Sequence, residues 1–307
     1  MNVESKKGNI AKNETWTKDA EKMWEKLTLS NNFIFCKVMM NKELCRKILS
    51  EILGEEVSRV EYPEYEKVIQ SRYDAKSVRL DVYLRDDEET VYNVEMQNTL
   101  KDCIPKRGRY YQDLIDIDLL EKGSYYEELN KSIVIFICTF DLYKMGYYKY
   151  TFTNKCSEVP ELEYGDETTK IIVNTKGGKG EASDELKDFL NAVDGRFSKS
   201  EFSDKIRKEV EKVKHSRDAR REFMYLYVHD EDVRRESLEK GKEEGKIEGR
   251  IEMKKYDIFE LLEELGMIPE QLRKRVDEQS DIEVLKQWHK LSAKVSTIEE
   301  FEEKIKG

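Results

Sequence analysis

The chain is poor in the residues that build disulfide scaffolds and zinc sites. It has five cysteines and three histidines in 307 residues, with no C-x-x-C pair and no histidine at zinc-site spacing. An odd, scattered set of cysteines is typical of reduced thiols, so we expect a cytoplasmic protein without disulfides. The three histidines all fall in the second half of the chain, which disfavours a hydrolase built on a Ser-His or Cys-His pair.

Long apolar segments are also lacking. No stretch approaches the ~18 apolar residues of a membrane span. The N-terminal sequence MNVESKKGNIAKNETW holds no apolar signal core. We therefore expect a soluble protein with no membrane partner and no classical export signal.

An excess of positive charge is missing as well. Lys and Arg number 55 against 65 Asp and Glu, which gives a net charge of −10. Non-specific binding of nucleic acid relies on clustered cations, so any DNA contact must come from a local patch. The 38% of hydrophobic residues is enough to bury a core, and the length allows one large domain with an appendage, or two domains.

The first part of the predicted core, which follows a polar arm over residues 1–23, combines a helix and a β-hairpin. Apolar residues at helical spacing predict a helix over 41–53 that Gly54 ends as its C-cap. Apolar and polar residues then alternate over 77–84 and again over 90–97. Two such runs around the polar sequence RDDEE predict a hairpin.

The second part, which continues to residue 200, adds a helix and further strands. Pro105 opens a helical segment, whose predicted apolar face is Tyr110, Leu114, Ile117 and Leu120. The apolar run SIVIFICTF predicts a strand buried on both faces, and shorter strands are expected at 66–70, 148–153 and 170–174. The predicted fold class of residues 24–200 is therefore α/β, with a mixed sheet flanked by helices.

Residues 201–307 form a charged extension with helical periodicity. Gly241, Gly245 and Gly249 recur at intervals of four in it, a spacing that allows close helix–helix contact. The alternative is a solvated helix held by charge pairs between residues four apart. Apolar residues over 258–265 and 282–291 predict a small terminal helical unit for protein contacts or self-association.

Two acids are brought together by the register of the predicted hairpin. A turn centred on residues 87–89 makes Asp81 and Glu95 direct cross-strand neighbours, with Cβ atoms roughly 4.5–5.5 Å apart. Like charges opposed in this way are destabilising, and two converging carboxylates suit a hard divalent cation such as Mg²⁺. Mg²⁺ so held can polarise a phosphodiester and supply a nucleophilic water. The alternative is a solvated strand face on which Arg79 and other neighbours absorb the charge.

The helix after the hairpin starts with a basic cluster of Lys106, Arg107 and Arg109. Cations are unfavourable at the positive end of a helix, whereas a helix N-terminus with added basic side chains is a good phosphate site. Tyr110 and Tyr111 follow and could stack on a base or sugar. These residues are the candidate DNA contacts, and a role in surface solubility is the alternative.

Four stretches of the chain resemble the Rpn-type recombination-promoting nucleases, also called PD-(D/E)XK nuclease family transposases. These stretches are RLDVYL…YNVEMQ, IPKRGRYYQDLID, IVIFICTFDLY and YKYTFTNKCSE…KIIVNTKGG. The resemblance runs from about residue 24 into the glycine-spaced tail. It implies a restriction-endonuclease-like core and Mg²⁺-dependent DNA cleavage linked to recombination.

The resemblance also implies roles for single residues. Asp81 matches the motif aspartate and Glu95 the acid of the E-x-K/Q half, and the implied metal ligands are Asp81, Glu95 and Met96. Gln97 stands where the wider superfamily usually has lysine, so we expect Gln97→Lys to be tolerated and to raise activity. Glu51, at the margin of the apolar face of the 41–53 helix, is the candidate for an additional acid.

Two functions follow. The first is a Mg²⁺-dependent DNA endonuclease that uses Asp81, Glu95 and Gln97 next to the basic helix start. The second is a weak or inactive nuclease scaffold that acts as a DNA- or protein-interaction module through its helical extension, which the net charge of −10 favours.

Overall fold

The computed structural model describes residues 18–61, 68–69, 78–100, 103–120 and 123–305. The chain divides into two compact units, one that ends at Leu226 and one that starts at Tyr227. The predicted arm lies outside the described residues up to residue 17, and residues 18–26 are helical. The predicted limits of the nuclease-like domain, 24–200, stay a prediction.

The core of the first unit is a five-stranded mixed sheet with the order β3-β4-β5-β7-β6. Its strands are β3 (Val82–Arg85), β4 (Val91–Gln97), β5 (Ser132–Cys138), β6 (Lys149–Phe152) and β7 (Thr168–Asn174). The three central strands are parallel, and β3 and β6 pair antiparallel at the two edges. Every residue of β5 is buried, as its apolar run predicts, and so is every residue of β4.

A second, smaller sheet pairs β1 (Val68–Ile69) with β2 (Val78–Arg79). Of the strand predicted at 66–70, only residues 68–69 fall within the described part of the chain. The side chain of Arg79 lies outside it as well, so its predicted effect on the charge of the hairpin stays a prediction.

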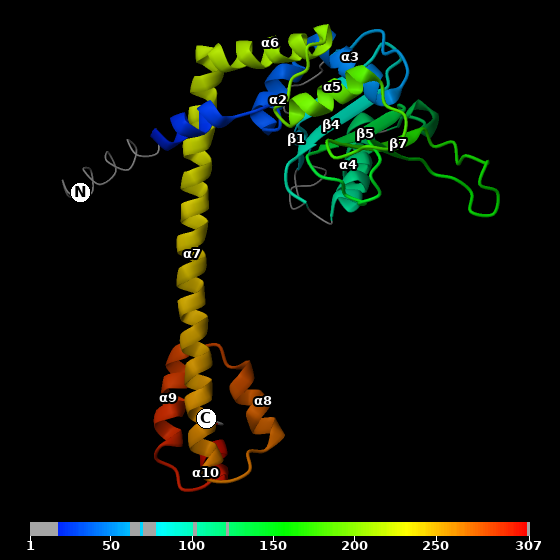
Figure 1. The fold of residues 1–307 in the computed structure, drawn as a ribbon. Coiled ribbons are helices and arrows are strands. Elements are labelled where there is room, and N and C mark those ends of the chain that lie inside the picture. The colour runs from blue at the N-terminus through cyan, green and yellow to red at the C-terminus, as the bar shows by residue number, and fades with distance from the viewer. Residues whose placement is uncertain (1–17, 62–67, 70–77, 101–102, 121–122, 306–307) are drawn as a thin grey trace. The chain divides into compact units, whose positions relative to one another are not determined.

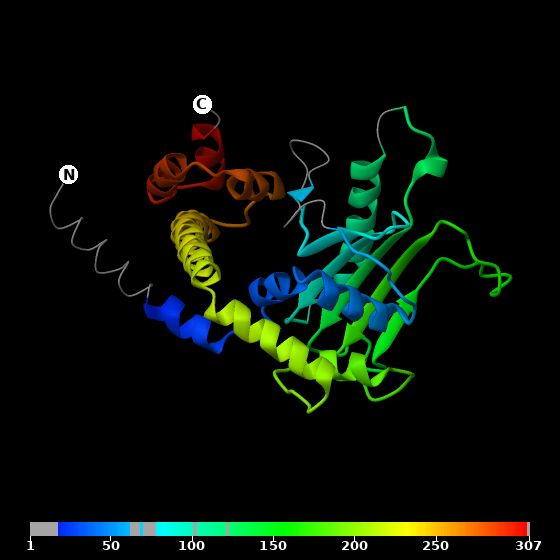
Figure 2. The same cartoon turned by 90° about the horizontal axis from the view of Figure 1, so that it is seen from above.

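Helices cover both faces of the five-stranded sheet (Figures 1 and 2). One face carries α2 (Asn32–Met39), α3 (Lys42–Leu53), α5 (Asp184–Val193) and α6 (Glu201–His215), and the other carries α4 (Ile104–Leu119). The predicted limits of α3 are confirmed. The side chain of Asn41 accepts the N–H of Leu44 at its start, and Gly54 ends it at φ 83°.

The face that α4 turns to the sheet differs from the predicted one. Ile117 is 59% exposed, and the buried positions include Ile104, Gly108, Tyr111, Leu114 and Ile115. A Cβ atom at Gly108 would lie 3.2 Å from the ring of Phe136 on β5, so the glycine allows the helix to approach the strand closely. Of the predicted face, Leu114 is buried and Ile117 is not, and the packing of Gly108 on Phe136 leaves no mark in an apolar pattern.

The second unit consists of helices. The helix α7 (Arg217–Glu263) runs across the boundary between the units, and α8 (Glu270–Glu278), α9 (Ile282–Ser292) and α10 (Ile298–Lys304) follow it. These three pack around the C-terminal end of α7 (Figure 1), with a core that includes Ile258, Leu262, Leu285 and Phe301. The helical nature predicted for residues 201–307 is confirmed.

The glycine-spaced stretch of α7 is exposed. A Cβ atom at Gly241, Gly245 or Gly249 would meet nothing within 4 Å among the described residues. Lys240 and Glu244 form a charge pair across one turn at 3.8 Å. Within the chain this stretch is a solvated helix with charge pairs, as the second alternative describes, and contact through the glycines with another chain stays a prediction. Separately, none of the described helices combines the length and the apolarity that crossing a membrane requires.

Candidate active site

The register predicted for the hairpin is observed. Val82 pairs with Val94 and Arg85 with Val91, and the next positions along the same register are Asp81 and Glu95. The backbone pairing of β3 with β4 ends at Val82. Beyond it, the two carboxylates accept the backbone N–H groups. The N–H of Asp81 donates to Oε1 of Glu95 at 3.2 Å, and the N–H of Met96 donates to Oδ2 of Asp81 at 3.1 Å. Both acids therefore lie at the point where β3 begins.

Glu95 is buried in a setting that disfavours its charge. It is 2% exposed, and burial, together with the negative charge of Asp81, raises its pKa to about 8. The hydrogen bond from the backbone N–H of Asp81 lowers the pKa again in part. The guanidinium of Arg107, whose Nη2 lies 3.5 Å from Oε2, acts in the same direction. Without a cation this setting favours the protonated form of Glu95, and a cation bound here would favour loss of that proton.

The donors at this point fit a small, hard cation. Within the described residues, no group of three or more His, Cys, Asp and Glu side chains is placed to hold a metal. Mg²⁺ is commonly bound through one or two carboxylates, with the remaining positions taken by water and substrate phosphates. Met96 can add its carbonyl oxygen, which points to the same side of the strand as its N–H and hence toward Asp81. Its side chain is buried and contributes no ligand.

Arg107 reaches the same place from α4. Its Nη1 donates to Oε1 of Gln97 at 2.8 Å, and its Nη2 donates to the hydroxyl of Tyr111 at 2.7 Å. The three residues line a cavity of about 510 Å³ that Asn32 and Met96 also line. Arg107 therefore lies in the candidate site itself, together with Gln97 and Tyr111.

Asn32 is a site residue that the sequence analysis missed. Its Nδ2 lies 3.3 Å from Oδ1 and 3.2 Å from Oδ2 of Asp81, so the amide at the start of α2 holds this carboxylate. The pair Asn31–Asn32 before an apolar run is a helix-start signal, and Asn31 does accept the N–H of Phe33. That signal says nothing of a contact with a residue 49 positions away.

The other predicted DNA contacts divide by exposure. Lys106 and Arg109 are exposed at the start of α4. Tyr110 packs against the apolar cluster under the sheet. Tyr111 is only 7% exposed, and its ring stacks on Phe136 with the centroids 6.2 Å apart. Tyr111 therefore has no free ring face for a base, contrary to the prediction, and it serves instead as a partner of Arg107.

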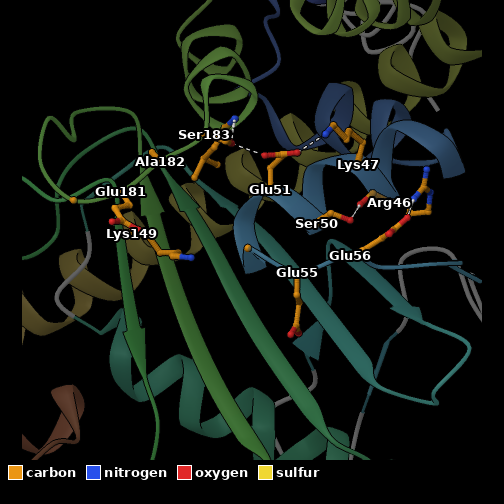
Figure 3. Close-up of a pocket in the computed structure, with 13 residues that line it drawn as sticks. Arg46, Lys47, Ser50, Glu51, Glu55, Glu56, Lys149, Glu181, Ala182 and Ser183 are labelled. Atoms are coloured by element: carbon orange, nitrogen blue, oxygen red, sulfur yellow. Dashed lines mark hydrogen bonds and ion pairs between the residues drawn. The ribbon is translucent and has the colours of Figure 1, made fainter.

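Glu51 lies in a different cavity from the one that Arg107 lines. Figure 3 shows its carboxylate between Lys47 on α3 and the hydroxyl of Ser183, and it is hydrogen-bonded to both. The surrounding cavity of about 910 Å³ is lined by side chains of both charges. In the described part of the chain, Glu51 bonds Lys47 and Ser183 and makes no contact with Asp81 or Glu95, so the structure does not bring this candidate acid to the site.

A comparison with protein families gives a match over part of the chain. Residues 32–168 match the family model described as PD-(D/E)XK nuclease family transposase. Residues 32–168 belong to this family. The matched segment starts at Asn32 and includes Asp81, Glu95, Gln97 and Arg107, and it ends before the helical extension. No curated protein and no solved structure matches the chain.

The PD-(D/E)XK assignment confirms the fold class and the family predicted from the sequence. A mixed five-stranded sheet with helices on both faces is consistent with a restriction-endonuclease-like core. The family supports a function of the nuclease or transposase type, with DNA as the implied substrate.

Proposed function

We propose that this protein is a Mg²⁺-dependent DNA endonuclease of the Rpn type, which cleaves phosphodiesters in connection with recombination. The observation that carries the proposal is the pair of carboxylates at the start of β3. The carboxylate of each acid accepts a backbone N–H from the strand of the other, and the pKa of Glu95 is raised to about 8. Perturbed acids of this kind next to a cavity are typical of functional sites.

Each side chain of the site has a distinct task in this proposal. Asp81 and Glu95, with the carbonyl of Met96, hold the cation, which when bound polarises a phosphodiester. Asn32 keeps the carboxylate of Asp81 in place through its two contacts. Gln97 is only 8% exposed, and its side-chain oxygen accepts a hydrogen bond from Arg107.

DNA would approach over the exposed start of α4. Lys106 and Arg109 are exposed there and can neutralise backbone phosphates without any reading of sequence. The five cysteines are free thiols in the structure, which supports the cytoplasmic location that belongs to this proposal.

A plasmid-nicking assay tests the proposal. The wild type, Asp81→Ala and the control Asp184→Ala are each incubated with supercoiled DNA in Mg²⁺ and in EDTA. The side chain of Asp184 is 95% exposed on α5, so its removal deletes an aspartate of no assigned role. We expect cleavage in Mg²⁺ by the wild type and the control alone, and none in EDTA.

Absence of metal-dependent cleavage by the wild type on any DNA form would overturn the endonuclease. It would favour the alternative function, a scaffold that contacts DNA, a protein or a second copy of itself through its helical extension.

A further inference from the structure

We infer that Arg107 is the catalytic cation of this site and that Gln97 is the residue that positions it. The inference rests on the proposed nuclease and names the group that stabilises negative charge on the attacked phosphate. Position 97 carries a neutral amide, so it cannot supply that charge itself. The guanidinium of Arg107, 2.8 Å from that amide oxygen, supplies it from another element of the fold.

The guanidinium is held in one orientation by contacts on several sides. Its Nε and Nη2 both donate to the hydroxyl of Tyr111, at 3.2 and 2.7 Å, and its Nη1 donates to Gln97. The charged group also lies 5.3 Å from the ring centroid of Tyr111 and 5.9 Å from that of Phe136. A cation fixed in this way needs no reorganisation when charge develops in a transition state.

The closest partners of Arg107 are uncharged groups. The short contacts are to a neutral amide and a neutral hydroxyl, and the contact with Glu95 is the longest at 3.5 Å. Among the described residues, these contacts use four of the N–H donors, and one on Nη1 is left. The side chain is 26% exposed and lines the cavity, so a phosphate oxygen can reach this donor.

The close approach of α4 to the sheet makes this placement possible. Gly108 follows Arg107 directly, and a Cβ atom at Gly108 would lie 3.2 Å from the ring of Phe136. With the helix backbone this near β5, the side chain of Arg107 reaches Gln97, the last residue of β4.

The hydrogen bond between Arg107 and Gln97 changes the expected effect of Gln97→Lys on activity. The sequence alone predicts that this change is tolerated and raises activity. In the structure, a lysine at position 97 would replace the acceptor of Arg107 by a second cation, and the two would repel each other. The lysine can act only when Arg107 is removed.

A charge-relocation experiment tests the inference. Single-turnover cleavage, DNA affinity and melting temperature are measured for the wild type, Arg107→Gln, Gln97→Lys and the double variant. The control is Arg221→Gln, which removes an arginine whose side chain is 81% exposed on α7. We expect each single variant at the site to slow cleavage, Arg107→Gln by about 100-fold or more. Its DNA affinity should change much less than its rate.

The double variant carries the decisive comparison. Because it moves the cation from position 107 to position 97, it should cleave at least ~10-fold faster than Arg107→Gln. Arg107→Lys, which keeps a charge but loses the fork of donors, should fall between the wild type and Arg107→Gln.

The outcomes separate this inference from the proposed function. A wild type without metal-dependent cleavage overturns the nuclease, and the role of Arg107 with it. A cleaving wild type with an equally active Arg107→Gln overturns only the role of Arg107. A folded double variant no faster than Arg107→Gln, with Arg107→Lys equally slow, makes Arg107 a structural residue and also overturns it.

Discussion

The backbone N–H of Asp81 donates to the carboxylate of Glu95 at 3.2 Å, at the position where the antiparallel ladder of β3 and β4 would continue. On β4, the backbone N–H of Met96, the residue after Glu95, donates to the carboxylate of Asp81. Each acid thus satisfies a backbone donor of the opposite strand. The two carboxylates are fixed close together by the edge of the sheet, before any cation is bound.

This pair makes the stability of the metal-free protein depend on pH. The pKa of Glu95 is about 8 in the folded chain, and a Glu in an unfolded chain has a pKa of roughly 4.3. Between these values the folded state binds more protons than the unfolded state. The contribution of Glu95 is therefore fully present below pH ~4.3 and is lost as the pH rises through about 8.

Urea unfolding in EDTA between pH 5 and 9 measures this loss. We expect Glu95→Gln to lack it, whereas Glu161→Gln, which alters an exposed glutamate, should keep the wild-type dependence. The same slope in the wild type and in Glu95→Gln would show that Glu95 does not have the raised pKa.

Arg109 should contribute to DNA binding through charge alone. Its side chain is exposed on α4, so Arg109→Gln should weaken binding about equally on all sequences. The slope of log K against log salt should become shallower by about 0.9, the value for one phosphate contact. Fluorescence anisotropy in EDTA on two unrelated duplexes measures both quantities. An unchanged slope would leave Arg109 as a solubility residue only.

The turn after β7 should tolerate a methyl group at one glycine and not at its neighbour. A Cβ atom at Gly177 would lie 2.4 Å from Cα of Tyr148, whereas one at Gly178 would meet nothing within 4 Å among the described residues. Gly177→Ala should therefore destabilise the protein by roughly 1–3 kcal/mol or more. Gly178→Ala should be near neutral. Chemical unfolding of the two variants checks this, and equal stabilities would contradict the packing of this turn on Tyr148.

Much of the fold could be predicted because it is encoded locally. The alternation over 77–84 and 90–97, with the short polar turn between them, was enough to set Asp81 opposite Glu95. Asn41 and Gly54 marked the ends of α3 because a cap residue and a left-handed glycine act on their own helix turn. The apolar run of β5 likewise predicts a buried strand from its own residues alone.

The parts of the site that were missed depend on packing between distant elements. Asn32 reaches Asp81 only because the start of α2 lies beside the start of β3. The contact of Arg107 with Gln97 joins α4 to the end of β4, and a hydrophobic pattern reveals neither this contact nor the space that Gly108 leaves for Phe136. Glu51 is an acid on the predicted helix, but it bonds Lys47 and Ser183 and so lies away from the site.

The central claim is that Asp81 and Glu95 together hold a divalent cation, and calorimetric titration with Mg²⁺ tests it without reference to cleavage. Binding requires the charged form of Glu95, whose pKa is about 8, so the wild type should bind more tightly at pH 8.5 than at pH 6.5. Asp184→Asn should match it. Asp81→Asn should show no binding at either pH, while equal binding by Asp81→Asn and the wild type, or none by the wild type, would contradict the claim.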